Sequence, residues 1–320
     1  MQVIRQLPEK PTESCVLALG NFDGVHLGHR RLLESGLETA QKMKIKLSVL
    51  LFEPHPLKLL FPEKMIGLLT TSEKRLRILE QLGVDTVYLL PFTHQTADTT
   101  PEKFVSDILL RVGARYVVVG FNYSFGSQGK GTPEDLQGLG EKYGFGVSVL
   151  QAQTMAGKVI SSSSIRKALL QGDIRQAQSM LGRYPCLCGK VVKGEQRGRT
   201  LGYPTANIES AEDLLIPKRG SYAVWAEFEG KKLIGMMNIG MKPTFHAEYK
   251  TTIEVHFFDF QGNLYDQELT LDIVERLRDE RKFSGVGELL GQLQKDAVHA
   301  KKILEQEKIE GGLYKSSVFR

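Results

Sequence analysis

The sequence lacks the features that would tie it to a disulfide framework, a membrane or a nucleic acid. Its 320 residues include three cysteines, a small and odd number that excludes a disulfide framework. Cys186 and Cys188 have no second Cys/His pair nearby, which favours a structural role over a metal site. No apolar run approaches the ~20 residues that span a bilayer. The net charge of +5 contains no dense Lys/Arg block, which argues against nucleic acid as a partner.

Residues 1–14 also lack the apolar core of a signal peptide, so we expect a cytoplasmic protein with no membrane partner. Hydrophobic residues make up 41% and charged residues 25% of the chain, which is ordinary for a globular protein. A length of 320 residues accommodates two domains, each able to bury a core of its own. The mild positive charge suits small anionic ligands such as nucleotides. The sequence leaves the oligomeric state open.

The first half of the chain alternates between strand and helix patterns. Helices are expected between the strands, and the pairs Thr100-Pro101 and Thr132-Pro133 each provide an N-cap followed by proline at the first helical position. This alternation predicts a Rossmann-like α/β domain with a parallel sheet covered on both faces. Ligands of such sheets bind at the carboxyl ends of the strands, where the strand order reverses. The predicted strands are 15–19, 47–52, 86–90, 115–119 and 146–151.

The pattern changes near residue 184, where helical stripes give way to strand-like alternation. Several short strands separated by glycine turns predict a small antiparallel barrel or sandwich. An amphipathic helix is expected near 286–308. We therefore predict two domains, residues 1–183 and 184–320. The predicted strands of the second domain are 186–193, 221–228, 232–239, 251–258 and 267–274.

The segment after the first strand carries Gly20 and Gly28 and then opens a helix. Glycines let a phosphate approach the backbone, and the N–H groups of a helix start bind anions. His26 and His29 are ~300° apart around a helix, which places both rings within roughly 60° of each other on one face. Two imidazoles aimed at one phosphate can stabilise the charge that develops during displacement at phosphorus. The alternatives are polar surface histidines, or a zinc site with His55 as third ligand, but the glycines favour phosphate chemistry.

Four serines at 161–164 precede Arg166 and overlap the start of a helix predicted over 164–171. Hydroxyl and N–H groups at that helix start can hold the β- and γ-phosphates of a nucleotide, and Arg166 can neutralise them. Taken alone, the pattern fits an ordinary helix cap with a surface arginine, and the histidine pair favours the functional interpretation. Residues 126–132 superficially look like a P-loop, but they lack the Gly-x-x-x-x-Gly-Lys-Ser/Thr spacing. We interpret them as a substrate loop before a helix.

Residues 20–29 read Gly-Asn-Phe-Asp-Gly-Val-His-Leu-Gly-His, which resembles the adenylyltransferase half of bacterial bifunctional riboflavin kinase/FAD synthetases. Residues 52–56, 120–126 and 160–166 resemble three further motifs of that family, so the resemblance spans most of 15–175. Asn122 stands where the family often has Asp, and Ser164 where Arg is common. The resemblance implies a catalytic role for His26 and His29 and flavin binding by His55, Asn122 and Phe125. The residues expected to bind ATP or phosphate are Gly20, Phe22, Gly28, Ser161, Ser162, Ser163 and Arg166.

Residues 189–207, which end in Pro-Thr-Ala-Asn, resemble the riboflavin kinase domain, and the resemblance covers about 186–300. It implies that Thr205 and Asn207 hold Mg²⁺ on ATP, since oxygen ligands suit this hard cation. A glutamate on an alternating strand is usually inert, but the family position makes Glu254 the base for riboflavin's primary hydroxyl. His246 stands where glycine is frequent. The remaining implied residues are Gly194, Gly198 and Arg199 at the phosphates and Arg278 and Phe283 at the flavin.

The resulting hypothesis is an enzyme that phosphorylates riboflavin to FMN and adenylylates FMN to FAD, with ATP as co-substrate and Mg²⁺ as cofactor. Its partners are then the small molecules riboflavin, FMN and ATP. Two other classes stay open. One is a nucleotidyltransferase for another phosphorylated metabolite, with the barrel as an accessory module. The other is a non-enzymatic basic protein that binds RNA or senses a flavin.

Overall fold

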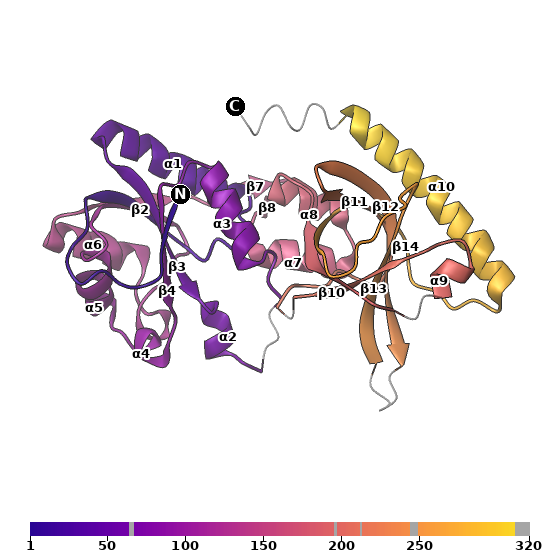
Figure 1. The fold of residues 1–320 in the computed structure, drawn as a ribbon. Helices are drawn as coiled ribbons and strands as arrows, with labels where there is room; N and C mark the ends of the chain where they lie inside the picture. The colour runs from indigo at the N-terminus through magenta and orange to yellow at the C-terminus, as the bar shows by residue number, and fades with distance from the viewer. Residues whose placement is uncertain (64–66, 195–196, 212, 244–248, 311–320) are drawn as a thin grey trace. The chain divides into compact units, whose positions relative to one another are not determined.

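The structure is a computed structural model, and it describes residues 1–320 except 64–66, 195–196, 212, 244–248 and 311–320 (Figure 1). Contacts divide the chain into two compact units. The first comprises Met1–Leu68 and Ser72–Ser162, and the second comprises Leu69–Thr71 and Ser163–Arg320. Helix α8 (Ile174–Leu181) and all but the first residue of α7 (Ser162–Gln171) thus group with the barrel by contacts. The division between residues 183 and 184, taken from the change of pattern, stays a prediction.

The first unit contains a six-stranded parallel sheet. All five strands predicted for it are confirmed to within two residues at each end. The additional strand β1 was missed because it has only three residues, all at least partly exposed, at the edge of the sheet. In spatial order the strands are β1 (Gln2–Ile4), β4 (Thr86–Pro91), β3 (Lys46–Glu53), β2 (Cys15–Leu19), β5 (Ala114–Gly120) and β6 (Gly146–Leu150).

Alternate residues of the strands feed two core layers, as a sheet covered on both faces requires. Val16 and Ala18 pack with α1 (Leu27–Met43) and α3 (Ser72–Gln81) on one face. Leu17 and Leu19 pack on the other face with α5 (Pro101–Phe104), the π-helical turn η1 (Val105–Leu109) and α6 (Pro133–Tyr143). Smaller elements are α2 (Pro56–Leu60), α4 (His94–Ala97), η2 (Ser127–Gly129) and the hairpin β7 (Thr154–Met155) and β8 (Lys158–Val159).

The two predicted N-caps are confirmed. The Thr100 hydroxyl accepts from the backbone N–H of Lys103, and Thr132 forms a reciprocal capping box with Asp135. These side chains satisfy N–H groups that the first helical turn leaves without partners. Among the described residues, no helix combines the length and the apolar character needed to cross a bilayer.

The strand order explains why the motifs of the first half converge. From β2 the chain moves outward through β3 and β4, and it then returns to the other side of β2 as β5. The loops that leave β2, β3 and β5 therefore emerge at the same edge of the sheet, around the point where the order reverses. Three of the predicted motifs, at 20–29, 52–56 and 120–126, lie at the carboxyl ends of these strands.

The second unit contains a closed antiparallel barrel with the order β10-β13-β12-β11-β14-β9. The five predicted strands and the final helix α10 (Val286–Glu310) are confirmed. The sixth strand was missed because only Ile208 of its five residues is buried, so no alternation marks it. The strands are β9 (Cys186–Val192), β10 (Ala206–Ser210), β11 (Gly220–Phe228), β12 (Lys231–Pro243), β13 (Tyr249–Phe257) and β14 (Glu268–Arg278), and the short helix α9 is Arg197–Thr200.

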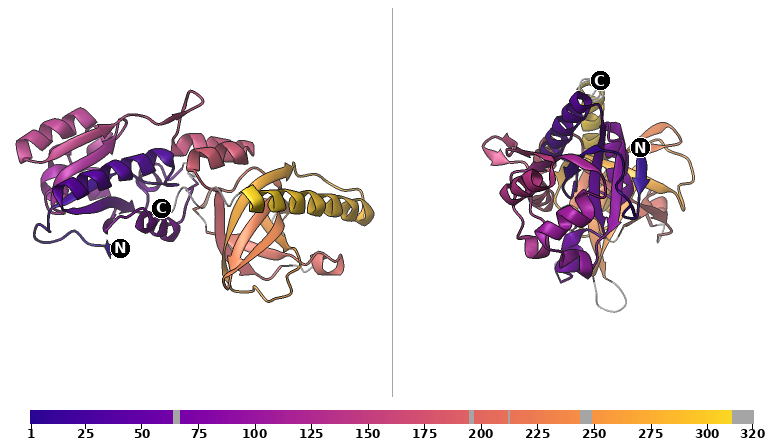
Figure 2. Two further views of the ribbon diagram at one scale, coloured as in Figure 1. Left: turned by 90° about the horizontal axis from the view of Figure 1, so that it is seen from above. Right: turned by 90° about the vertical axis from the view of Figure 1, so that its left-hand side faces the viewer.

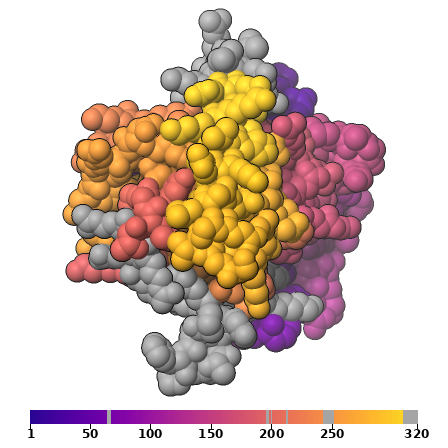
Figure 3. All heavy atoms as spheres, turned by 90° about the vertical axis from the view of Figure 1, so that its right-hand side faces the viewer, coloured from indigo at the N-terminus to yellow at the C-terminus, as the bar shows by residue number. Residues whose placement is uncertain are grey.

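Helix α10 runs along the outside of the barrel (Figures 2 and 3). Ala300 and Leu304 are buried there against Trp225, Met236 and Val274 of the strands. The predicted apolar stripe of this helix therefore covers one side of the barrel and leaves other parts of the barrel surface to carry polar groups.

Candidate active sites

The loop after β2 places the two histidines in direct contact. Their rings are stacked, with centroids 3.7 Å apart and planes at 14°. The expectation that both stand on one helical face needs correction, because His26 is the N-cap of α1 and has an extended backbone (φ −70°, ψ 174°). Its Nδ1 accepts a hydrogen bond from the backbone N–H of His29 at 3.3 Å. The cap, and not the helical repeat, brings the rings together.

Glycine at two positions of this loop leaves the neighbouring rings more room than any other residue would. A Cβ on Gly28 would lie 3.2 Å from both Cε1 and Nδ1 of His26 and 3.6 Å from the carbonyl oxygen of Ile160. A Cβ on Gly20 would likewise lie 3.2 Å from the ring of Phe22. The spacing His-x-Gly-His therefore reserves room for the ring of the first histidine at the start of the helix.

The serine run begins beside this loop. The Ser162 hydroxyl donates to the carbonyl oxygen of Asp23 at 2.9 Å, which links the start of α7 to the loop. Ser161 and Ser162 are half-buried. Ser163 is exposed and Arg166 is half-buried, and both belong to the second compact unit.

His55 caps α2 in the same way as His26 caps α1. Its Nδ1 accepts from the backbone N–H of Leu57 at 3.3 Å, and the residue is only 7% exposed. Within the described ranges, no group of three or more His, Cys, Asp and Glu side chains is arranged to hold a metal ion. The local contacts of His55 are those of a helix cap at the carboxyl end of β3.

The loop after β5 holds Asn122 at the surface and Phe125 in the core. Phe125 packs on Phe104 with centroids 5.4 Å apart, and its backbone pairs in both directions with Gly131. Burial raises the pKa of the neighbouring Tyr123 phenol. The buried rings therefore anchor a loop whose exposed tip presents Asn122.

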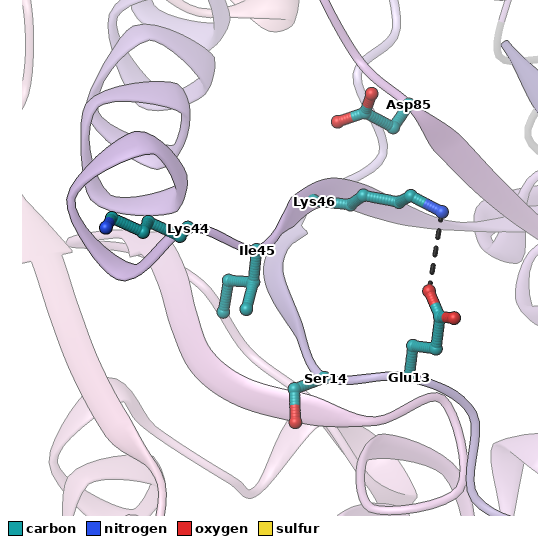
Figure 4. A pocket seen from close by; sticks show the side chains of 6 residues that line it. All are labelled: Glu13, Ser14, Lys44, Ile45, Lys46 and Asp85. Atoms are coloured by element: carbon teal, nitrogen blue, oxygen red, sulfur yellow. Dashed lines mark hydrogen bonds and ion pairs between the residues drawn. The ribbon is translucent and has the colours of Figure 1, made fainter.

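A pocket of about 450 Å³ lies at the opposite edge of the sheet (Figure 4). Its lining residues precede β2, precede or begin β3, and precede β4, so they stand at the amino ends of the strands. Lys46 and Glu13 form an ion pair across it at 3.4 Å. None of the predicted site residues lines this pocket. The lining residues are Glu13, Ser14, Lys44, Ile45, Lys46 and Asp85.

In the second unit, strand register gathers polar side chains from three strands. Glu254 of β13 is the direct cross-strand partner of Asn207 on one side and of Asn238 of β12 on the other. Directly opposed residues have Cβ atoms about 5 Å apart and project to the same face. Ile253 and Val255, which flank Glu254, are buried, so the polar row lies on the opposite face from the barrel core. The sequence analysis did not identify Asn238, since an asparagine on a strand carries no distinctive signal by itself.

The glycine-rich segment lies against the two predicted metal-binding residues. A Cβ on Gly194 would lie 2.1 Å from Nδ2 of Asn207, and one on Gly198 would lie 2.3 Å from the Tyr203 carbonyl oxygen and 3.3 Å from Oγ1 of Thr205. No larger residue fits either position without moving backbone or side chains. Arg199 lies in α9, but its side chain is outside the described part of the structure, as are residues 195–196 and His246.

His256 contacts the Pro-Thr-Ala-Asn segment through a hydrogen bond and a ring contact. Its Nδ1 donates to the Pro204 carbonyl oxygen at 2.8 Å, and its ring contacts Tyr203 edge-on, with centroids 5.1 Å apart. Strand alternation places it on the same face as Glu254, two residues earlier, and this is the sequence signal that could have identified it.

Arg278 and Phe283 lie beside α10. Arg278 forms a double hydrogen-bonded ion pair with Asp296, at 2.8 to 3.1 Å, and Asp296 is only 4% exposed. The guanidinium carbons of Arg281 and Arg278 lie 4.8 and 5.8 Å from the Phe283 ring centroid. Glu280, on the same segment, accepts from the backbone N–H of Met241 at 3.1 Å. This segment is therefore tied both to the helix and to β12.

Comparison with known proteins finds a separate family for each half of the chain. The profile of the FAD synthetase family matches residues 8–164, and that of riboflavin kinase matches residues 181–304. The bifunctional riboflavin kinase/FMN adenylyltransferase of Listeria monocytogenes is 39% identical over 282 residues, which cover 88% of this chain and 90% of the relative. The Bacillus subtilis protein of the same description is 37% identical over 292 residues, 89% of this chain and 91% of the relative. A Streptococcus pneumoniae crystal structure described as a macrolide-efflux protein has a TM-score of 0.84 and 32% identity, covering 92% of this chain and 97% of that one. The chain therefore belongs to the bifunctional riboflavin kinase/FMN adenylyltransferase family.

Proposed function

We propose that the two transfers of this family use two separate sites of the chain. The barrel phosphorylates riboflavin with ATP to FMN, and the α/β unit adenylylates FMN with a second ATP to FAD and pyrophosphate. One observation carries the assignment of the kinase site. Asn207 and Glu254 are direct cross-strand partners, so the proposed metal-binding and base residues stand side by side.

In the α/β unit, a phosphate oxygen of FMN attacks the α-phosphorus of ATP as the bond to pyrophosphate breaks. The second pKa of a phosphate monoester is about 6, so the nucleophile is anionic at neutral pH and needs no general base. His26 and His29 donate hydrogen bonds to the α-phosphate as its charge grows. Because Nδ1 of His26 accepts a hydrogen bond, the neutral ring carries its proton on Nε2, which serves as the donor.

The surrounding residues bind the rest of the substrates. The N-terminus of α1 adds backbone N–H groups that favour the phosphates. The loops after β3 and β5 flank β2 in the sheet, and we assign the flavin to His55, Asn122 and Phe125, with Phe125 acting through the loop that it anchors. The residues assigned to ATP and its phosphates are Gly20, Phe22, Gly28, Ser161, Ser162, Ser163 and Arg166.

In the barrel, Glu254 accepts the proton of riboflavin's primary hydroxyl while the hydroxyl oxygen attacks the γ-phosphorus and ADP leaves. A neutral hydroxyl is a poor nucleophile, so a positioned carboxylate assists this step. Gly194, Gly198 and Arg199 cover the phosphates. Arg278 and Phe283 bind the flavin from the segment that follows β14.

The two families use ATP and generally need a divalent metal. We assign Mg²⁺ to Thr205 and Asn207, whose side-chain oxygens are ligands that this hard cation accepts. The close approach of Gly194 to Asn207 and of Gly198 to Thr205 supports this, because it brings phosphate-binding backbone to the same two side chains. When bound, the ion neutralises charge on the phosphates. We place these reactions in the cytoplasm, with riboflavin, FMN and ATP as small-molecule partners and no nucleic-acid or membrane partner.

A pair of substitutions tests the division of labour. Glu254→Gln removes riboflavin phosphorylation and leaves FMN adenylylation, whereas His29→Ala does the reverse. Purified variants are incubated with ATP, Mg²⁺ and either riboflavin or FMN, and the flavins are separated and quantified. If either substitution abolishes both activities in a folded chain, the assignment of separate sites is wrong. If neither flavin is converted by the unaltered protein, the function itself is wrong.

A further inference from the structure

The loop between β2 and α1 adopts a conformation that its own residues disfavour. Phe22 (φ 49°) and Val25 (φ 38°) both lie in the left-handed region. A non-glycine residue is strained in that region, and a β-branched residue such as valine is rare there. Such a conformation persists only where surrounding contacts hold it. The loop leads directly into His26, so the contacts that hold it also determine where the histidine rings lie.

Two kinds of contact hold this loop. Phe22 and Val25 are fully buried in the apolar layer between the sheet and α1, which secures the loop on one side. On the polar side, Nη1 of Arg75 donates to the backbone carbonyl oxygen of Asn21 at 3.1 Å. Arg75 comes from α3, and it is itself 6% exposed. Helix α3, which follows β3 in the chain, therefore holds the backbone of this loop through a hydrogen bond from Arg75.

Electrostatics couples Arg75 to the same loop. Asp23 is 2% exposed, and a buried carboxylate is destabilising unless a cation compensates its charge. Burial lowers the pKa of the Arg75 guanidinium, and the charges of Asp23 and Glu53 oppose that effect. Glu53 in turn accepts hydrogen bonds from Ser72 at 2.7 Å and from Arg5 at 3.1 Å. The positive charge of Arg75 thus favours the buried Asp23 carboxylate inside the loop.

We propose that Arg75 is a positioning residue for adenylyl transfer, which holds the loop at 21–25 in its left-handed conformation and thereby sets the His26–His29 stack. The inference rests on the proposed role of these two histidines. The guanidinium suits the task because its planar donors can bind a carbonyl oxygen while its delocalised charge faces carboxylates. A lysine keeps the charge but offers no such fork. Substitution by lysine or by methionine therefore separates the contribution of the positive charge from that of the hydrogen bond to the loop backbone.

The test compares Arg75→Met and Arg75→Lys with Arg77→Met, a matched control on the exposed face of the same helix. Assays use the full chain well below its unfolding temperature. We expect Arg75→Met to lower kcat for FMN adenylylation about 100-fold, the effect of a displacement of about 1 Å in the catalytic groups, with a smaller change in KM for ATP. Arg75→Lys recovers part of the loss. Arg77→Met stays at the level of the unaltered protein.

Riboflavin phosphorylation in the same samples reports whether the chain is otherwise intact, and it stays unchanged. A second measurement covers the case in which Arg75→Met weakens folding. Adding Asp23→Asn to Arg75→Met recovers part of the thermal stability, because the buried charge that Arg75 stabilises is then absent as well. Adenylylation by Arg75→Met within twofold of the unaltered protein overturns the proposal, as does strict additivity of the two substitutions. If His29→Ala keeps full adenylylation, the proposed role of the histidines fails instead.

Discussion

Substitution of Gly28 by alanine separates catalysis from stability, because the two effects have opposite signs. In the first turn of α1, alanine favours the helix over glycine by roughly 0.5–1 kcal/mol. Gly28 has no positive φ, so its backbone accepts alanine without strain. The added Cβ, however, would lie 3.2 Å from two atoms of the His26 ring. The α/β unit should therefore become slightly more stable while its active site is disturbed.

The size of the disturbance follows from the geometry. A contact at 3.2 Å must open by a few tenths of an ångström, and the Ile160 carbonyl at 3.6 Å leaves the methyl group little room on its other side. The His26 ring is the group that moves, because it is a side chain whereas the Ile160 oxygen belongs to the backbone. A displacement of about 1 Å in a catalytic group costs about 100-fold in rate, so a shift of a few tenths predicts a loss of roughly tenfold in adenylylation.

The assay measures FMN adenylylation, riboflavin phosphorylation and thermal unfolding by calorimetry on the same preparation. The control is Gly138→Ala, at an exposed position of α6 where a Cβ would meet nothing within 4 Å. Both substitutions should raise or preserve stability, but only Gly28→Ala should slow adenylylation, and neither should affect phosphorylation. Full adenylylation by Gly28→Ala would refute the reasoning, because it would show that the position of the His26 ring does not matter.

Further predictions concern the barrel and the sheet. Gly198→Ala should abolish riboflavin phosphorylation and spare adenylylation, since its Cβ would lie 2.3 Å from the Tyr203 carbonyl oxygen. Retained kinase activity would show that phosphorylation does not depend on this close approach. Asp296→Ala should destabilise the barrel by about 3 kcal/mol by leaving Arg278 without its anion. The chain's one tryptophan lies in β11, so its fluorescence during urea unfolding reports on this unit, and an unchanged midpoint would be the contrary result. Burial raises the pKa of the Cys15 thiol from 9.0 to about 11, so its contribution to stability is complete below pH 9 and is lost as the pH rises through 11. Iodoacetamide should label Cys15 slowly at pH 8 in the folded chain and rapidly in urea.

Much of the fold was predictable because the decisive signals are local. Buried parallel strands need continuous apolar runs, and the run at 15–19 became β2 without a change of boundary. Thr132 and Pro133 start α6 through contacts within one helical turn. The missed strand β10 shows the limit. Its pairing with β9 and β13 is stabilised by partners far away in the sequence, and its own five residues carry no periodic pattern.

The candidate sites divide in a similar way. Residue types and spacing predicted the histidine pair and the serine run, because their chemistry requires particular side chains at short separations. Glu254 was predicted from the family resemblance, and its role stays a prediction. The stacking of His26 on His29 was not predictable from a helical repeat, since it depends on a cap outside the helix. Arg75 belongs to no local motif. Its proposed positioning role follows from its burial and from its hydrogen bond to Asn21, 54 residues earlier in the sequence.

The sequence by itself determined the two fold classes, the order of the units and the family, because apolar periodicity, caps and contiguous motifs are written along the chain. Only the tertiary structure decided which residues meet. Strand order brings the loops after β2, β3 and β5 to one edge, and barrel register sets Asn207 beside Glu254. The same holds for the contact between Arg75 and the histidine loop. The physical reason is that such contacts depend on long-range pairing and burial, whose stabilisation comes from the whole core and leaves no short-range pattern in the residues that benefit.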